Sequence, residues 1–257
     1  MHVARTGLDA QSQRMRVIAN NLANVNTTGF KRDPADFASL GYQTLTAPGA
    51  ISGGEDRHAI GTQLGGGVAM RGTAPIMAQG SFNVSDNPLD LAIQGDGFFQ
   101  VAQRDGTVGY TRAGDFQRSA EGKLVTADGR ALVPEITIPD NATAVTIAAD
   151  GTVSASLPGE AEASEVGKIE LARFANPAGL QPLGDSLYAA TSASGEAQVG
   201  AAGDEGRGTI RQGALEGSNV NIVQELVDMI ETQRAYEVNS KMISATDEML
   251  KNAAQQL

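Results

Sequence analysis

The sequence predicts an α+β fold, with a helix at each end of the chain and an antiparallel β-domain between them. Apolar residues recur every seven positions near both termini, a spacing that keeps one seam on one side of a helix and suits a coiled coil. The centre instead carries short β-branched runs separated by glycine-rich turns, and 31 of the 257 residues are glycine. Such ends pack against each other or against neighbouring copies, an arrangement that favours assembly over catalysis.

The N-terminal helix is predicted from about Val3 to Val25. Its seam consists of Leu8, Met15 and Leu22, with Gln11, Ile18 and Val25 at the intervening positions. Because glycine readily adopts the left-handed conformation that closes a helix, Gly29 is expected just past the helix end. Pro34 then prevents any continuation. The asparagines of the cluster Asn20, Asn21 and Asn24 cap this helix or bond neighbouring backbones, and the pattern supports both roles equally.

Residues 42–67 have the composition of a flexible loop. They contain few large apolar residues and many turn formers, among them Pro48, Gly49 and the run Gly65-Gly66-Gly67. A loop of this length in a compact domain is usually functional or disordered. His58 lies here near Glu55 and Asp56, but a lone histidine on a glycine-rich loop is more typical of a solvated surface than of a metal site.

Residues 68–210 read as strands and turns. The predicted strands are Phe98–Val101, Val108–Thr111, Leu124–Thr126, Ile136–Ile138, Val145–Ile147 and Lys168–Phe174. Asp105-Gly106, Asp128-Gly129 and Asp150-Gly151 fall between them, and Asp-Gly is a strong tight-turn signal. Residues 156–164 and 192–208 are predicted as surface loops. This pattern is typical of an antiparallel β-domain.

The C-terminal helix is predicted from Ile222 to about Ala253, roughly 48 Å at ~1.5 Å per residue. Asn221 is placed to cap it, with Gln224 three residues on as in a capping box. The seam comprises Ile222, Leu226, Met229, Gln233, Tyr236, Ile243 and Leu250, interrupted by Ser240 and Asp247. Further apolar residues lie beside it: Val223, Val227, Ile230, Val238, Met242 and Met249. The apolar face is therefore wider than one partner helix needs.

The two helices need partners on energetic grounds. Ordering their backbones costs more free energy than burying one seam returns, and isolated helices are marginal in water. Burial on several sides, in an assembly, is the robust solution. The alternative is an ordinary antiparallel helix pair that caps the β-domain of a monomer, and periodicity alone supports both arrangements equally.

Composition excludes several classes of function. The formal net charge of −11 argues against nucleic acid and against an anionic membrane surface, since both require clustered Lys and Arg. No stretch approaches the ~20 apolar residues of a membrane span. The residues from Met1 to Thr6 lack the pattern of a secretory signal. With no cysteine, disulfides and cysteine-type zinc sites are excluded.

No catalytic motif stands out. Gly95-Asp96-Gly97 begins like a dinucleotide loop, but Gln100 occupies the position of the third glycine. The sequence contains neither a P-loop nor a Gly-x-Ser-x-Gly elbow. Asp86 and Asp90 flank Asn87-Pro88 and are typical of a turn before a strand. We therefore expect no catalytic residue, no cofactor and no resident metal.

Four segments resemble the motifs of bacterial flagellar rod and hook proteins, in the order found in that family. They are Asn20–Lys31 (NNLANVNTTGFK), Asp90–Val101 (DLAIQGDGFFQV) with Tyr110–Phe116 (YTRAGDF), Gly217–Asn221 (GSNVN), and Glu225–Val227 with Gln233–Glu237 (QRAYE). Together they cover nearly the whole chain. Within the family, the length and the segment from Tyr42 to Val68 resemble the distal-rod group rather than the longer hook proteins. The resemblance also implies several further residues ahead of Ala4.

The resemblance implies a self-assembling structural subunit of the distal rod, a stiff tube that transmits motor torque to the hook. It divides the chain into an assembly helix (1–30), a Gly-rich segment of distal-rod type (31–67), a β-rich domain (68–216) and a second assembly helix (217–257). The helices would form a coiled-coil-like inner layer and the β-domain an outer layer. Proximal rod and hook subunits share these motifs and remain alternatives. From a different class, a secreted β-rich adhesin or a cell-wall enzyme also remains.

The resemblance also assigns roles to residues and partners. The expected assembly interface comprises Leu8, Met15, Ile18, Asn20, Asn21, Leu22, Asn24, Val25, Ile222, Leu226, Met229, Ile230, Gln233, Tyr236, Ile243 and Leu250. The expected rod-stiffening segment includes Tyr42, Gln43, Pro48, Gly49, Gly65, Gly66 and Gly67. Expected partners are further copies, proximal rod proteins, the hook protein, the surrounding rings and the flagellar export apparatus. The expected place is the periplasmic part of the basal body, reached through the flagellum's own export channel without a cleaved signal peptide.

Overall fold

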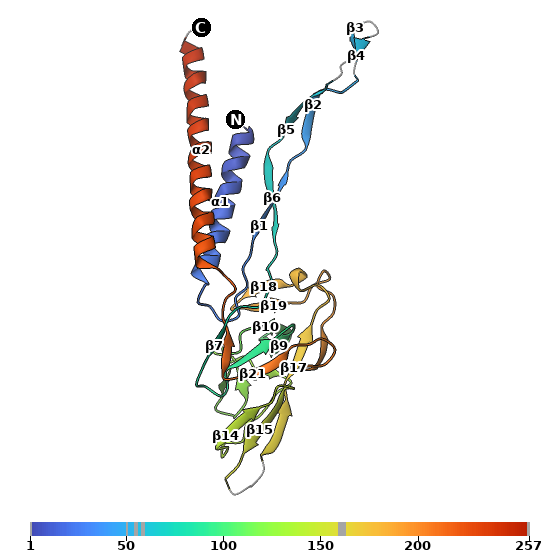
Figure 1. The fold of residues 1–257 in the computed structure, drawn as a ribbon, viewed down its shortest axis with the longest axis vertical. Helices are drawn as coiled ribbons and strands as arrows, with labels where there is room; N and C mark the ends of the chain where they lie inside the picture. The colour runs from blue at the N-terminus through green and yellow to red at the C-terminus, as the bar shows by residue number, and fades with distance from the viewer. Residues whose placement is uncertain (1, 50, 54–55, 58–59, 159–162, 256–257) are drawn as a thin grey trace. The chain divides into compact units, whose positions relative to one another are not determined.

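The computed structural model describes residues 2–49, 51–53, 56–57, 60–158 and 163–255. Among these residues it contains an N-terminal helix, a C-terminal helix and antiparallel strands (Figure 1), which confirms the predicted α+β class. The chain divides into two compact units. Unit 1 comprises residues 1–22, 33–74 and 221–257, and unit 2 comprises residues 23–32 and 75–220. The chain therefore passes between the units four times.

Unit 1 contains both helices, α1 (His2–Ala23) and α2 (Ile222–Gln255). The predicted cap of α2 is confirmed, because Asn221 Oδ1 accepts hydrogen bonds from the amides of Val223 at 3.0 Å and Gln224 at 3.3 Å. The reciprocal half of the capping box is wrong, since the Gln224 side chain donates forward to Asp228 at 3.2 Å. α1 ends at Ala23, slightly before the predicted end.

Unit 1 also contains a long hairpin built from nested strand pairs. These are β1 (Ala35–Ser39) with β6 (Val68–Thr73), β2 (Tyr42–Thr46) with β5 (Thr62–Gly65), and β3 (Ile51–Gly53) with β4 (Asp56–Arg57). Between the first two pairs, the Leu40 amide donates to Gly67 O at 2.8 Å and the Gly66 amide to Gly41 O at 3.1 Å. Backbone hydrogen bonds thus hold this ribbon together without a large apolar core.

The flexible loop expected for residues 42–67 is therefore wrong where β2 and β5 pair. Composition suggested a loop because large apolar residues are few, yet a two-stranded ribbon needs only backbone pairing and tight turns. The sequence also placed the start of the β-domain at residue 68, whereas residues 68–73 form β6 and pair with β1. His58 and Glu55, which sequence analysis considered as a metal site, lie outside the described residues.

Unit 2 is built on an antiparallel sheet with the strand order β18-β19-β10-β9-β17-β20, to which β13 adds by pairing with β9. Its strands are β9 (Phe98–Ala102), β10 (Val108–Thr111), β13 (Leu132–Val133), β17 (Glu170–Arg173), β18 (Gln181–Gly184), β19 (Leu187–Ala189) and β20 (Gln198–Ala201). The three predicted Asp-Gly turns are confirmed. Their glycines, Gly106, Gly129 and Gly151, have φ values of +83°, +78° and +90°.

Smaller pairings surround this sheet in unit 2. They are β7 (Phe82–Val84) with β22 (Ala214–Glu216), β8 (Leu91–Gln94) with β21 (Thr209–Gln212), β11 (Gln117–Arg118) with β12 (Leu124–Val125), and β15 (Thr152–Ser156) between β14 (Ala144–Ile147) and β16 (Ser164–Lys168). A short 3-10 turn, η1 (Pro177–Gly179), precedes β18.

Three sequence-based boundaries in unit 2 are wrong. Ile136–Ile138 is not a strand, although both isoleucines are buried, because the segment makes only an isolated bridge between Thr137 and Lys123. The predicted loop 192–208 contains β20. The predicted strand Lys168–Phe174 is divided between β16 and β17, with the buried Ile169 between them.

The core of unit 2 lies on both sides of the sheet. Neighbouring residues on a strand point to opposite faces, so Phe98 and Phe99 on β9 enter different clusters. Phe99 packs edge-on against Phe116 in the larger aliphatic cluster, with ring centroids 5.2 Å apart. Phe98 packs edge-on against Phe174 and Tyr188 in the smaller aromatic cluster. Few aromatics are present in the chain, but most of the sheet's packing on this second face comes from them.

Candidate assembly surface

The face that α2 turns towards α1 is mostly polar or small, with Met229 and Ile243 as its large apolar members. The most buried residues of α2 are Glu225 and Thr232, at 0% and 1% exposed, followed by half-buried positions in the same stripe. These half-buried positions are Asp228, Ala235, Asn239, Ile243 and Thr246. The two helices run antiparallel and side by side (Figure 1), as the contacts below show.

Polar contacts join the two helices within unit 1. Asn21 on α1 is 1% exposed and donates from Nδ2 to Glu225 Oε2 at 3.3 Å. Its amide group also bonds the Asp33 backbone in both directions, at 2.8 Å to the carbonyl and 3.0 Å from the amide. Further along, Arg14 Nη2 lies 3.9 Å from Asp228 Oδ1. The internal helix contact is thus made largely by hydrogen bonds and charges.

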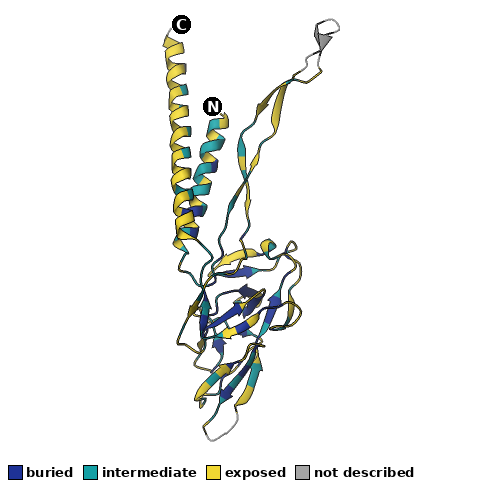
Figure 2. Cartoon of the chain, in the orientation of Figure 1, coloured by how far each residue is buried: buried dark blue, intermediate teal, exposed yellow. Residues whose placement is uncertain are grey.

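Most of α2 outside this stripe is exposed (Figure 2), and its exposed residues include several apolar ones. Residues two positions apart on an α-helix lie about 200° apart, so Val223 and Val227 point away from the side that buries Glu225. The exposed stripe comprises Val223 at 71%, Val227 at 45%, Ile230 at 51%, Val238 at 60%, Met242 at 53% and Met249 at 71%. Charged residues such as Arg234 and Lys241 lie among them, but large exposed apolar side chains gathered on one element mark an interaction surface.

The stripe that α2 buries within the chain lies one residue N-terminal to the predicted seam. Glu225, Asp228, Thr232 and Ala235 take the places expected for Leu226, Met229, Gln233 and Tyr236. Of the predicted seam, Met229 and Ile243 are half-buried, whereas Ile222, Leu226, Gln233 and Tyr236 are exposed. The side chain of Leu250 lies outside the described set. Most of the predicted α2 interface therefore remains available in a single chain.

The predicted α1 residues are less available. Ile18 and Asn21 are buried, and Leu8, Met15, Leu22, Asn24 and Val25 are half-buried, which leaves Asn20 as the exposed member. Asn24 Oδ1 accepts from the Thr27 hydroxyl at 3.1 Å, a local contact just past the helix end. α1 thus uses much of its predicted interface within its own chain.

The predicted rod-stiffening residues lie along the hairpin. Tyr42 and Gln43 pair with Gly65 and Leu64 in the β2–β5 strand pair. Pro48 and Gly49 are exposed beyond the end of β2. Where the β1–β6 pair meets the β2–β5 pair, Gly65 and Gly67 help line an apolar hollow of about 540 Å³ in unit 1. Its apolar walls are Val3, Ala4, Val68 and Met242.

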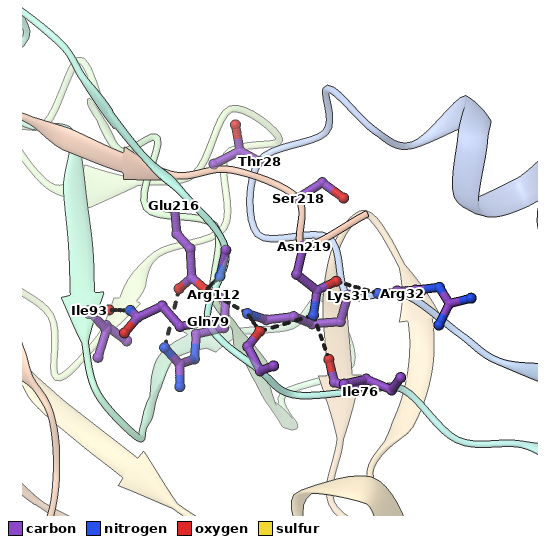
Figure 3. A network of polar contacts seen from close by, with 12 residues as sticks. Thr28, Lys31, Arg32, Ile76, Gln79, Ile93, Arg112, Glu216, Ser218 and Asn219 are labelled. Carbon is purple, nitrogen blue, oxygen red and sulfur yellow. Dashed lines mark hydrogen bonds and ion pairs between the residues drawn. The ribbon is translucent and has the colours of Figure 1, made fainter. Parts of the chain in front are cut away.

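Unit 2 contains a buried charge cluster that sequence reasoning missed (Figure 3). The carboxylate of Glu216, at 0% exposed, accepts from Lys31 Nζ at 2.5 Å and from Arg112 Nη1 at 3.2 Å. The Gly80 amide donates to the same carboxylate at 2.9 Å. Burial lowers the pKa of Lys31 and of Arg112, and Glu216 opposes that effect for both. One carboxylate thus forms ion pairs with two buried cations.

Two signals in the sequence pointed towards this cluster. Lys31 and Arg112 both belong to the family-like segments, where a charged residue beside apolar neighbours suggests a buried pair. Glu216 lies directly before the third segment and had no distinguishing neighbour. Spacing along the chain cannot reveal that residues 31, 112 and 216 meet, because the sheet brings them together.

Among the described residues, neither helix is long and apolar enough to cross a membrane. In the same part of the chain, no group of three or more His, Cys, Asp or Glu side chains is arranged to hold a metal ion.

Comparison with known proteins gives matches along most of the chain. Residues 1–31 match the family model described as flagella basal body rod protein. Residues 92–155 match the flagellar hook protein FlgE/F/G D1 domain, and residues 211–256 match the flagellar basal body rod FlgEFG protein C-terminal model.

Full-length relatives give the same result. The chain is 47% identical to the flagellar basal-body rod protein FlgG of Buchnera aphidicola subsp. Acyrthosiphon pisum, over 98% of this chain and 97% of the relative. It is 44% identical to FlgG of Caulobacter vibrioides over 99% and 98%, and 37% identical to FlgG of Bacillus subtilis over 95% and 94%. These relatives are structural proteins, which decides against the cell-wall enzyme and the adhesin. The chain therefore belongs to the flagellar basal-body rod and hook family, as a structural subunit of the rod.

Proposed function

We propose that this rod subunit polymerises with further copies of itself into a stiff tubular distal rod, which transmits motor torque to the hook. The observation that carries this proposal is the set of exposed apolar residues on α2, which the contact with α1 leaves uncovered. A helix that buries Glu225 and Thr232 and exposes Val223 and Val238 has its apolar side reserved for another molecule. The FlgG names of its relatives favour the distal rod over a proximal rod or hook position.

The two helices supply the inner layer of this tube, packed in a coiled-coil-like manner. The exposed stripe and the exposed predicted seam residues Ile222, Leu226, Gln233 and Tyr236 contact neighbouring copies. The half-buried residues of the predicted interface contribute to the same layer: Leu8, Met15, Leu22, Asn24, Val25, Met229 and Ile243. Burial on several sides offsets the entropy cost that one helix pair leaves uncompensated.

The hairpin of residues 35–73 bridges adjacent subunits and limits bending of the tube. An isolated two-stranded ribbon is marginally stable in water, and β2 and β5 expose Tyr42, Leu45 and Leu64 at 66%, 60% and 53%. A neighbouring subunit would cover these side chains. The glycines Gly65, Gly66 and Gly67 permit a close approach of backbones.

The partners of the polymer follow from its place in the flagellum. Proximal rod proteins lie at one end and the hook protein at the other, with the basal-body rings around it. The subunit reaches its periplasmic position through the flagellar export apparatus.

A single charge placed on the exposed stripe tests the proposal. Val238→Asp puts a carboxylate on the stripe, 60% exposed in the single chain, so the unassembled chain keeps its fold. In a polymer the same carboxylate would be buried without a partner, which costs several kcal/mol. We expect the critical concentration for polymerisation, measured by sedimentation, to rise at least tenfold.

Val84→Asp is the matched control. Val84 is 77% exposed on β7 in unit 2 and undergoes the same chemical change away from the helices. We expect this variant to polymerise as the unchanged chain does. Equal effects of the two substitutions would show that added negative charge, and not the α2 stripe, controls assembly, and the proposal would then be wrong.

A further inference from the structure

The four passages of the chain between the units occur at residues 22/23, 32/33, 74/75 and 220/221. Force carried along the backbone enters unit 2 only through these passages. Their attachment within unit 2 therefore decides how firmly the helices and the hairpin are held to the β-sheet.

Three of the four passages are hydrogen-bonded to one another through Asn219 (Figure 3). Asn219 Oδ1 accepts from the Arg32 amide at 2.7 Å, and Nδ2 donates to Ile76 O at 2.8 Å and to Ala78 O at 3.0 Å. The Ile76 amide also donates to Arg32 O at 2.9 Å. Residues 32, 76 and 219 each lie within two positions of a passage, so one side chain connects all three.

The charge cluster continues from this connection into the sheet. Lys31 Nζ donates at 2.9 Å to Ala78 O, which also accepts from Asn219, and it pairs with Glu216. Glu216 then reaches Arg112, whose guanidinium lies 5.2 Å from the ring centroid of Phe98. The backbone carbonyl of Glu216 accepts from the Gly29 amide at 2.8 Å. A continuous polar chain thus runs from the passages to the centre of the sheet.

Close backbone approach supports the same region. A Cβ on Gly29 would lie 2.5 Å from Ala113 N, and Gly29 has φ +68°. Gly217 donates to Ser81 O at 2.7 Å, beside the point where Gly80 meets Glu216. Segments that approach this closely cannot slide past one another without breaking these bonds.

We propose that Asn219 is an anchor that fastens three of the four inter-unit passages to each other, and that the Lys31–Glu216–Arg112 cluster ties this anchor to the sheet. The anchor gives the segment Gly217–Asn221 a positioning role, because the side chain of Asn219 bonds Arg32 and Ile76 next to the other two passages. Its mechanical consequence, that torque carried by these three passages enters unit 2 at one stiff point, rests on the proposed function. The anchor itself does not.

Amide hydrogen exchange on the unpolymerised full-length chain tests the anchor. Asn219→Ala removes the acceptor of the Arg32 amide but leaves the Ile76–Arg32 hydrogen bond chemically possible. We expect the Arg32 and Ile76 amides to exchange at least tenfold faster together, because the passages separate as a unit. The Leu124 and Ile138 amides, bonded to Ile136 O and Gly122 O elsewhere in unit 2, should keep their rates.

The matched control is Asn176→Ala. Asn176 also donates from Nδ2 to a backbone carbonyl of unit 2, Ala193 O at 3.0 Å, but far along the chain from every passage. Its removal should leave the Arg32 and Ile76 rates unchanged. Faster exchange at Arg32 alone in the Asn219 variant would show that Asn219 makes only a local hydrogen bond to Arg32. Equal acceleration at Leu124 would show a general loss of stability, and either result overturns the anchor.

Asn219→Asp provides a second variant that keeps the acceptor oxygen and removes the donor. It should leave Arg32 protected and expose Ile76, and equal protection of both would contradict the anchor. For the mechanical part, fibres of Asn219→Ala should have a persistence length at least twofold shorter than those of Asn176→Ala. Equal persistence lengths would refute that part. If the unchanged chain forms no fibre, the proposed function fails, while the exchange rates still decide whether the anchor exists.

Discussion

At the scale of single residues, Glu216 joins several segments of unit 2. Its side chain is fully buried and accepts from Lys31, Arg112 and the Gly80 amide. Burial lowers the pKa of both cations, and this carboxylate only partly offsets that effect. Removing that charge leaves two buried cations without a counter-ion, the costly case for ionic groups in a protein interior.

Glu216→Gln should therefore destabilise unit 2 by about 3–5 kcal/mol. The glutamine keeps the size of the side chain and loses the charge, so packing is unchanged. Urea unfolding followed by tyrosine fluorescence measures the loss, because Tyr110 and Tyr188 lie in the sheet of unit 2. Glu165→Gln, at an exposed position on β16, is the control and should cost less than about 0.5 kcal/mol. A similar small effect at Glu216 would contradict the role of the cluster.

Asp115 predicts a pH dependence in the opposite direction from an ordinary carboxylate. Burial, followed by the negative charges of Asp90 and Asp128, raises the pKa of Asp115. The unfolded chain therefore releases this proton at lower pH than the folded chain, and the contribution of Asp115 to stability falls as the pH rises through that interval. Above the folded pKa the penalty is constant.

Asp115→Asn removes this penalty. The variant should unfold at a higher urea concentration than the unchanged chain at neutral pH, and the difference should vanish near about pH 3, where aspartate is protonated in both states. If the difference persisted unchanged at low pH, the introduced amide group, and not the loss of the charge, would be its cause.

At the scale of elements, one glycine shows how the segment after α1 reaches the sheet. Sequence analysis placed Gly29 just past the helix end, but α1 ends at Ala23 and Gly29 lies against the Arg112–Ala113 backbone. The residue type was noticed for a sound reason, a left-handed conformation with φ +68°. The reason for that conformation is a close approach that only the three-dimensional fold reveals.

Gly29→Ala and Gly129→Ala form a matched pair. Both glycines have positive φ, at +68° and +78°, but a Cβ on Gly129 meets nothing within 4 Å. Gly129→Ala should cost only the left-handed strain, about 1 kcal/mol. Gly29→Ala adds a steric clash and should cost about 3 kcal/mol. Equal losses in thermal or urea unfolding would remove the close approach as an explanation.

The elements also show what the sequence could predict. Seven-residue spacing located both helices, and Asp-Gly pairs located three turns of the sheet. The polar contact between the two helices was not predicted, because the pattern assumes that apolar residues make the internal contact. Here Asn21 and Arg14 make it instead, with Glu225 and Asp228. The hairpin was missed because its stability comes from backbone pairing, which leaves no apolar signature in Tyr42–Thr46.

At the scale of the whole molecule, the hairpin provides a test of stiffness. Replacing residues 42–65 by a two-residue Asn-Gly turn keeps the β1–β6 strand pair, because the Gly66 amide already donates a hydrogen bond to Gly41 O at 3.1 Å. The fibres formed by this variant should be more curved and more flexible in electron micrographs. The unfolding transition of unit 2 should stay unchanged as a control. Straight fibres of normal persistence length would show that the hairpin does not limit bending.

The exposure of apolar residues on α2 also affects the unassembled subunit. Polar contacts hold α2 to α1, while the exposed apolar residues of α2 stay in water. Exposed apolar surface of this kind normally promotes aggregation. With a formal net charge of −11, mutual repulsion keeps solitary molecules apart, and dissolved ions weaken that repulsion over a distance of ~10 Å at 0.1 M. Raising the ionic strength should accordingly lower the concentration at which light scattering first detects association.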